Sequence, residues 1–266
     1  MKKRTTNYEL RTTASTLRVL LSNDDGISAE GLVSLEKVAA ALSKDVWVVA
    51  PEAEQSGAGH SLTLHTPVRV RKISAKRYAV LGTPTDCVLL ALKQIIPAKQ
   101  KVDLLLSGIN RGSNVGDDVT YSGTIAAAME GSILGVPSVA LSLLYDDPEH
   151  IHWKAVEKLA PPIIRRLLSK PWPKDTLINL NFPNCAASKV RGIKVCAQGK
   201  RIVNVQLSQR VDPKGRPYFW LGGERDYRPE KPNVDVDFLQ KGYITITPIG
   251  MDMTDYKTLA AMDKLF

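Results

Sequence analysis

Two adjacent carboxylates, Asp24 and Asp25, stand two residues after a short apolar run and directly before Gly26. Successive side chains of a strand point to opposite faces, so neighbouring carboxylates converge only where the chain turns, and a glycine permits such a turn. Two converging carboxylates without a counter-charge repel each other, and a hard divalent cation relieves that repulsion. The pair is therefore a candidate metal site; the alternative is a solvated Asn-Asp-Asp-Gly turn that caps the next helix.

Two later segments offer neutral oxygen ligands. Ser56 opens the run 56–60 (SGAGH), in which small residues let the backbone approach an ion or a phosphate closely. Asn110 lies in the run 107–116 (SGINRGSNVG), and an asparagine carbonyl is a good ligand for magnesium or manganese. Taken alone, each segment is also explained by a flexible loop or an Asn/Gly turn.

A third segment, Tyr121-Ser122-Gly123-Thr124, opens a helical pattern. The free N–H groups of a helix start, together with nearby hydroxyls, form a natural phosphate cradle. Ser122 as a simple N-cap is equally compatible, because one hydroxyl can serve both purposes. We expect a side chain at Gly123 to weaken substrate binding while leaving metal binding nearly intact. The predicted phosphate contacts are Gly57, Asn114, Ser122, Gly123 and Thr124.

Several other polar residues near these segments are ambiguous. His60 and His65 are candidate proton donors near the phosphate, but packed or exposed histidines explain them as well. Arg111 is either a phosphate contact or a surface arginine. Asp117 and Asp118 either shape the pocket from behind the ligands or form a solvated loop pair.

Apolar runs alternate with helical patterns through the first half of the chain. Strands are expected over residues 17–21, 46–49 (stopped by Pro51), 78–81, 102–106 and 138–143, and helices over 32–42, from Thr83-Pro84 to 96, and over 123–134. Such alternation predicts a parallel sheet with helices on both faces, in which ligands bind beyond the carboxyl ends of the strands. The polar segments 22–26, 52–60 and 107–121 all follow strands, so we expect them to meet at one edge of the sheet.

The pattern changes after about Pro183. The runs 201–207 and 217–221 alternate like a hairpin joined through residues 212–215, 242–248 is a predicted strand, and 253–266 is a polar amphipathic tail. The returning strand carries Tyr218, Phe219 and Trp220, which a lone hairpin cannot bury. We therefore expect the hairpin to pack on a neighbouring subunit.

Composition narrows the class of protein. Lys and Arg number 36 against 27 Asp and Glu, a formal charge of +9, which favours anionic ligands. A net positive charge also suits a general nucleic-acid binder, but here the positive charges are scattered along the chain, which argues against that alternative. Three cysteines without a CxxC pair predict reduced thiols in a cytoplasmic protein. No apolar run approaches the ~20 residues of a membrane helix, so no membrane partner is expected.

Five spaced strings carry a family resemblance: LLSNDDGISAEGL, APEAEQSGAGHSLTL, LGTPTDCV, SGINRGSNVGDDVTYSGTIAAAMEG and GYITITPIGMDMT. In this order the chain resembles the SurE survival proteins. The resemblance implies a Rossmann-like α/β fold with a parallel sheet, helices on both faces and a protruding C-terminal β-hairpin used for homodimers or homotetramers. It implies a catalytic domain (17–188) followed by a hairpin and oligomerisation region (189–266). The polar segment 1–16 is expected to be a flexible extension, and it departs from the usual start of the family, which comes right before the first strand.

The resemblance also implies an activity. SurE proteins are metal-dependent nucleotidases that act on nucleoside 5′- and 3′-monophosphates, and some also act on short polyphosphate. Their ligand positions fall here on Asp24, Asp25, Ser56 and Asn110, which would hold one divalent cation, Mg²⁺ or Mn²⁺. The implied reaction is in-line attack of water, with Asp24 or Asp25 as the catalytic carboxylate. The alternative is a nucleotide-binding regulatory module without turnover, against which the intact ligand set argues.

Overall fold

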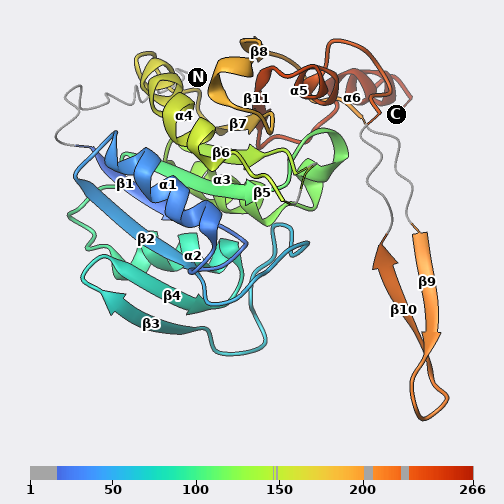
Figure 1. The fold of residues 1–266 in the computed structure, drawn as a ribbon, viewed down its shortest axis with the longest axis horizontal. Helices are drawn as coiled ribbons and strands as arrows, with labels where there is room; N and C mark the ends of the chain where they lie inside the picture. Colours follow the sequence, from blue (N-terminus) through green and yellow to red (C-terminus); the bar gives the residue numbers. More distant parts are fainter. Residues whose placement is uncertain (1–16, 146, 148, 201–205, 223–227, 266) are drawn as a thin grey trace.

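A mostly parallel sheet with helices on both faces forms the body of the molecule (Figure 1). The computed structural model describes residues 17–145, 147, 149–200, 206–222 and 228–265, so the predicted extension 1–16 lies outside the described residues. The strands are β1 (Arg18–Ser22), β2 (Asp45–Pro51), β3 (Arg69–Ser74), β4 (Arg77–Leu81), β5 (Leu104–Arg111), β6 (Ser138–Leu143), β7 (Thr176–Phe182), β8 (Ile193–Val195), β9 (Gln206–Val211), β10 (Pro217–Gly222) and β11 (Ile244–Gly250). The α-helices are α1 (Glu30–Ala40), α2 (Pro84–Leu90), α3 (Gly123–Ile133), α4 (Trp153–Leu168), α5 (Asp235–Gln240) and α6 (Tyr256–Met262).

The sheet confirms the predicted fold class. Its strand order is β3-β4-β2-β1-β5-β6-β7-β11-β8, and the run from β4 to β7 is parallel throughout. β3 and β11 pair antiparallel with β4 and β7, so they flank the parallel core. β8 and β11 come from the predicted C-terminal region and extend this same sheet.

Two apolar layers cover the two faces of the sheet. The helices α1 and α4 pack on one face and α2 and α3 on the other, as the membership of the two core clusters shows. β1 illustrates the alternation, because Val19 and Leu21 enter the first layer and Leu20 the second. A strand that is buried on both faces has a nearly continuous run of apolar residues, and such runs allowed β1, β5 and β6 to be predicted from the sequence.

The start of α2 follows its local signals. The Thr83 hydroxyl caps α2 by accepting a hydrogen bond from Asp86 N, and the Asp86 carboxylate in turn accepts one from Thr83 N. Pro84 occupies the first turn of the helix. The predicted continuation of this helix to residue 96 differs, because after Leu90 the chain forms a π-helix, Ala91–Ile95.

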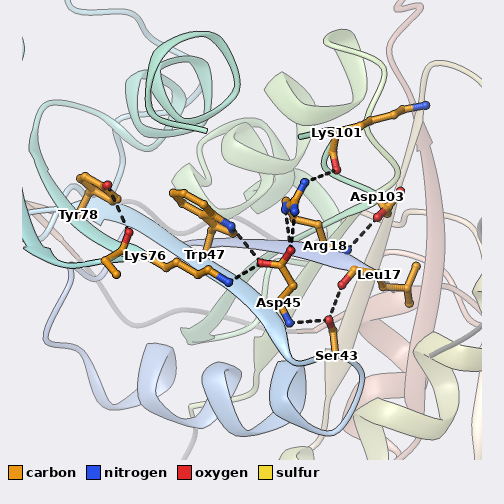
Figure 2. Close-up of polar contacts among 10 residues, drawn as sticks. Leu17, Arg18, Ser43, Asp45, Trp47, Lys76, Tyr78, Lys101 and Asp103 are labelled. Carbon is orange, nitrogen blue, oxygen red and sulfur yellow. Dashed lines mark hydrogen bonds and ion pairs between the residues drawn. The ribbon is translucent and has the colours of Figure 1, made fainter. Parts of the chain in front are cut away.

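Polar contacts fasten the amino ends of the central strands, as Figure 2 shows. Arg18 Nε and Lys76 Nζ each lie 2.8 Å from an oxygen of Asp45, and Arg18 N donates to Asp103 Oδ2 at 2.8 Å. Burial raises the pKa of Asp45, but the hydrogen bonds and charges of Lys76 and Arg18 outweigh it and hold that pKa below its ordinary value. Because these contacts join the starts of β1, β2, β4 and β5, they align the strands whose opposite ends carry the candidate site.

The hairpin forms, but with a different first strand. β9 pairs antiparallel with β10, with Gln206 opposite Gly222 and Val211 opposite Pro217. The first strand therefore runs to Val211 and not to Leu207 as predicted, and residues 201–205 of the predicted strand lie outside the described residues. The predicted turn is present, since Asp212 Oδ1 accepts from Lys214 N and Arg216 N.

The described helices include none with the length and apolar character that crossing a bilayer requires.

Candidate active site

The three polar segments predicted to converge do so around one pocket of about 850 Å³ at the carboxyl edge of the sheet. The segments lie at the carboxyl ends of β1, β2 and β5, which are side by side in the parallel core. β5 runs to Arg111 and not to Leu106 as predicted, so Asn110 lies on this strand and not after it. Seven of the predicted site residues line this pocket: Asp24, Asp25, Ser56, Gly57, Asn110, Asn114 and Ser122.

Three hydrogen bonds from backbone N–H groups join these segments. Gln55 N donates to Asp24 O at 2.8 Å, which places Ser56 beside the carboxylate pair. Gly59 N donates to Tyr121 O at 3.2 Å, and Arg111 N donates to Asp25 Oδ2 at 3.3 Å. The loops are thus held to one another, as a site that must keep its geometry requires.

The turn after β1 has the conformation that its sequence predicts. Gly26 has φ +101°, a left-handed value that favours glycine. Asn23 Nδ2 donates to Gly26 O at 2.8 Å and closes the turn. Asp24 and Asp25 therefore both line the pocket, although they are neighbours in sequence.

Asp24 is almost completely buried, with 4% of its surface exposed. Burial raises its pKa to about 6; the hydrogen bond from the Thr124 hydroxyl opposes this rise, and the charge of Asp25 adds to it. Burial also raises the pKa of Asp25, the backbone amide and charge of Arg111 lower it, and the charge of Glu54 raises it. Both carboxylates are thus destabilised as anions in the absence of a cation.

The neutral members of the set keep oxygens for a ligand. Asn110 Nδ2 donates to Gly112 O at 2.7 Å, which leaves the carbonyl oxygen Oδ1 for coordination. The Ser56 hydroxyl donates to Glu54 Oε1 at 2.7 Å, and its oxygen retains lone pairs. In the described part of the chain no group of three or more His, Cys, Asp or Glu side chains is placed to hold a metal ion by itself, so a cation here would need the neutral oxygens as well. Two carboxylates, a hydroxyl and an amide carbonyl fit one hard divalent cation with positions to spare.

The predicted phosphate contacts separate into two groups. Gly57, Asn114 and Ser122 line the pocket, and the Ser122 hydroxyl also caps α3 by accepting from Ile125 N at 3.1 Å. Gly123 and Thr124 are not among the lining residues and lie against Asp24. A Cβ at Gly123 would come within 2.7 Å of Asp24 Cβ. A side chain at Gly123 would therefore press against Asp24, a predicted metal ligand, which weighs against the expectation that such a side chain spares metal binding.

The structure also shows where the residues with ambiguous roles lie relative to the pocket. His60 Nε2 lies 3.0 Å from Glu130 Oε2 and lines a neighbouring hollow, not this pocket, and His65 is exposed. Arg111 and Asp118 line the pocket, whereas Asp117 is not among its lining residues.

Sequence reasoning missed four lining residues: Glu54, Ser113, Tyr121 and Tyr145. The first three lie within or beside the segments already singled out, so their position gave a usable signal. Tyr145 follows β6 and lies outside every motif. Its ring centroid lies 5.4 Å from Arg111 Cζ, a contact between distant residues that only the fold reveals.

Comparison with known proteins agrees with the predicted resemblance. The family described as survival protein SurE matches residues 19–205. The chain belongs to the SurE family. A relative named 5′-nucleotidase SurE, from Paramagnetospirillum magneticum, is 53% identical over 252 residues, which cover 95% of this chain and 96% of the relative. Another of the same name, from Parvibaculum lavamentivorans, is 50% identical over 93% of this chain and 90% of its own.

A solved structure supports the same assignment. The SurE protein from Aquifex aeolicus superposes with a TM-score of 0.80 at 40% identity, covering 93% of this chain and 99% of the other. The sheet and the separate hairpin described above are therefore the fold of a SurE protein.

Proposed function

We propose that this protein is a divalent-metal-dependent 5′-nucleotidase that removes phosphate from nucleoside monophosphates. Two relatives that are about half identical over nearly the whole chain bear the name 5′-nucleotidase. The observation that carries the metal dependence is the convergence of Asp24, Asp25, Ser56 and Asn110 on one pocket. Of the two neighbouring carboxylates Asp24 is buried and Asp25 partly buried, and both have a raised pKa, so a cation beside them would stabilise their ionised forms.

In this proposal one Mg²⁺ or Mn²⁺ is held by the oxygens of those four residues. When bound, the cation supplies positive charge opposite the phosphate oxygens. Asp24 or Asp25 acts as the catalytic carboxylate, whose free oxygen orients the attacking water and accepts its proton. The Thr124 hydroxyl holds Asp24 in place for this role.

The phosphate is held by donors that the fold places beforehand. Asn114 contributes an amide N–H and Ser122 a hydroxyl, and both line the pocket. The backbone amides of Gly57 and Gly123 add N–H groups, the latter from the first turn of α3, where helix amides have no partner within the helix. Fixed donors of this kind stabilise the charge on the transferring group.

The nucleoside has aromatic surface available in the same pocket. Tyr121 is largely exposed there, and Tyr145 lies beside Arg111 on the pocket wall. We assign these rings to the base, because a base stacks on an aromatic face with little sequence preference.

The proposal extends to the remaining properties implied by the resemblance. The 3′-monophosphates and short polyphosphate are included as substrates, and a homodimer or homotetramer as the assembly. A cytoplasmic location is supported by the cysteines, since no disulfide joins Cys87, Cys185 and Cys196. No specific nucleic-acid partner is proposed.

A substrate panel tests the proposal. The protein is treated with chelator and then assayed for phosphate release with Mg²⁺ or Mn²⁺, using nucleoside 5′- and 3′-monophosphates, p-nitrophenyl phosphate and tripolyphosphate. We expect release to require the metal and to be fastest with a nucleoside 5′-monophosphate. Binding of monophosphate without release would instead identify a regulatory module. Salt-sensitive retention of DNA or RNA without release would identify a nucleic-acid binder.

A further inference from the structure

Two asparagines on β7 are buried, although their polar side chains do not suit an apolar core and they do not line the pocket. Asn179 and Asn181 are both 0% exposed, and neither is among the residues that line the pocket. An amide in a buried strand costs free energy unless its groups are hydrogen-bonded, so the partners of these amides indicate their purpose.

Their partners lie on Asn114. Asn181 Oδ1 accepts from Asn114 N at 2.9 Å, while Asn179 Nδ2 and Asn181 Nδ2 both donate to Asn114 O, at 2.7 and 3.2 Å. The two asparagines are also joined to each other, with Asn181 Nδ2 donating to Asn179 Oδ1 at 3.0 Å. Both backbone polar groups of Asn114 are therefore held by β7.

The side chain of Asn114 is held by the strand in between. Its Nδ2 donates to Ser142 Oγ at 2.9 Å, and Ser142 is itself fully buried on β6. An amide nitrogen carries two hydrogens, so the second one remains for another acceptor.

The sheet register explains why β7 reaches the site. Asn110 pairs with Ser142 across β5 and β6, and Ser142 pairs with Asn181 across β6 and β7. A polar row therefore crosses three strands at their carboxyl ends, from a candidate metal ligand to the asparagines that hold Asn114.

We propose that Asn179, Asn181 and Ser142 are positioning residues, which hold Asn114 so that the second hydrogen of its Nδ2 meets a phosphate oxygen of the substrate. This inference rests on the proposed function, in which Asn114 contacts phosphate. A donor held by three neighbours loses little entropy on binding and needs no rearrangement when charge develops. A merely structural network would satisfy the Asn114 backbone without affecting phosphate.

The test measures inhibition by inorganic phosphate in the metal-loaded enzyme, in a double-mutant cycle. The variants are Ser142→Ala, Asn181→Ala, Asn114→Ala and the two double variants with Asn114→Ala. We expect Ser142→Ala and Asn181→Ala each to raise the Ki of phosphate about tenfold, the scale of one lost hydrogen bond, with the Kd of Mn²⁺ unchanged. In the Asn114→Ala background the same changes should have no further effect on Ki. Ser142→Ala removes a single hydroxyl, so it carries the test if Asn181→Ala does not fold.

Thr245→Val is the matched control. Thr245 pairs with Asn181 across β11 and β7, and its buried hydroxyl has no hydrogen-bond partner among the described residues. This variant should keep the Ki of the wild type. The inference is overturned if Ser142→Ala folds and leaves Ki unchanged, or raises it equally in both backgrounds. If Asn114→Ala itself leaves Ki unchanged, the phosphate contact is wrong and the inference falls with it, whereas absence of metal-dependent release by the wild type overturns the proposed function.

Discussion

In the metal-free protein, the surroundings of Asp24 disfavour the ionised form of its carboxyl group. It is buried between the end of β1 and the start of α3, and one neighbour, Asp25, has the same charge. The hydrogen bond from the Thr124 hydroxyl lowers the pKa of Asp24, but the pKa still lies at about 6. A group that destabilises the empty protein and stabilises the loaded one is typical of a site built for a ligand.

The first prediction is a pH dependence of stability in chelator. Since the pKa of Asp24 is about 6 in the folded protein, against 3.8 for an unperturbed aspartate, the folded state binds this proton more tightly. The free energy of unfolding should therefore fall as pH rises from about 4 to about 6, and stay low above that window. The pKa difference corresponds to roughly 3 kcal/mol. Asp24→Asn lacks this titration, so without metal it should be more stable than the wild type above pH 6.

Urea unfolding of both proteins in chelator, at pH 4 and pH 7.5, measures this difference. We expect a small gap at the lower pH and a gap of roughly 3 kcal/mol in favour of Asp24→Asn at the higher one. Added Mn²⁺ should stabilise the wild type more than the variant. A gap of the same size at both pH values would show that the buried carboxylate is not the cause.

The second prediction concerns Asp25, the other charged ligand. Asp25→Asn keeps the size of the side chain and removes one charge, so the fold should survive. Activity with a nucleoside monophosphate should fall at least about a hundredfold, which corresponds to ~3 kcal/mol of transition-state stabilisation. Asp263→Asn, at an exposed aspartate just after α6, is the control and should remain near the wild type. Full activity of Asp25→Asn in chelator-treated buffer with added metal would contradict the metal assignment.

The parts of the site that stand in local sequence motifs could be predicted, whereas the parts that depend on contacts between residues far apart in the sequence could not. Asp24, Asp25 and Ser56 stand in local motifs in the loops after β1 and β2, and Asn110 lies near the carboxyl end of β5, so pattern and topology together could bring them to one edge. Asn179 and Asn181 are polar residues inside a strand that belongs to no recognised motif. Only the register of β5, β6 and β7 joins them to Asn114, and a register is not readable from a single sequence.

At the scale of elements, the decisive feature is the close approach of the β1 end to the start of α3. Gly123 allows it, because a Cβ there would lie 2.7 Å from Asp24 Cβ and 3.0 Å from Asp24 Oδ2. The third prediction is that Gly123→Ala raises the Kd of Mn²⁺ at least about tenfold and lowers kcat/KM in parallel, because it displaces a ligand. Calorimetry and kinetics on the same preparation measure the two effects.

Gly250→Ala is the matched glycine control, since a Cβ at Gly250 meets no atom within 4 Å. It should leave both quantities unchanged. If Gly123→Ala weakened phosphate binding alone and left the Kd of Mn²⁺ at its wild-type value, the ligand-displacement argument would fail.

Several elements with a clear local signal were predicted, whereas α4, β3 and the buried strand β7 were not; in β7 the polar Asn179 and Asn181 interrupt the apolar run. β6 covers the predicted residues 138–143, because it is short, apolar and bounded by turns. α4 was not predicted; it contains Pro161 and Pro162, which usually end a helix, yet its apolar face packs on the sheet beside α1. β3 is exposed along its whole length and pairs only with β4, so no burial pattern marked it.

At the scale of the whole molecule, the hairpin stands apart. Among the described strands β9 and β10 pair only with each other, and Figure 1 shows them away from the sheet. Tyr218 and Trp220 alternate with Phe219 and Leu221 along β10, so both faces of the ribbon carry large apolar side chains. Trp220 is 65% and Leu221 80% exposed. Exposed apolar surface of this extent on a narrow arm marks an interaction site, because water is a poor solvent for it.

The last prediction is that this arm joins subunits. Replacing residues 206–222 by a short Gly/Ser linker should lower the mass measured by light scattering, because the apolar faces of the ribbon lose their partner. Trp220→Ser with Leu221→Ser should weaken the assembly in the same direction while leaving the pocket residues untouched. Lys214→Ser, at the exposed turn of the same hairpin, is the matched control and should keep the mass of the wild type. The phosphate-release assay run alongside separates assembly from catalysis, since the pocket is lined only by residues outside the arm. If the wild type has the mass of two or more chains and removal of the whole arm leaves that mass unchanged, the subunits associate through another surface; a wild-type mass of one chain would contradict the prediction directly.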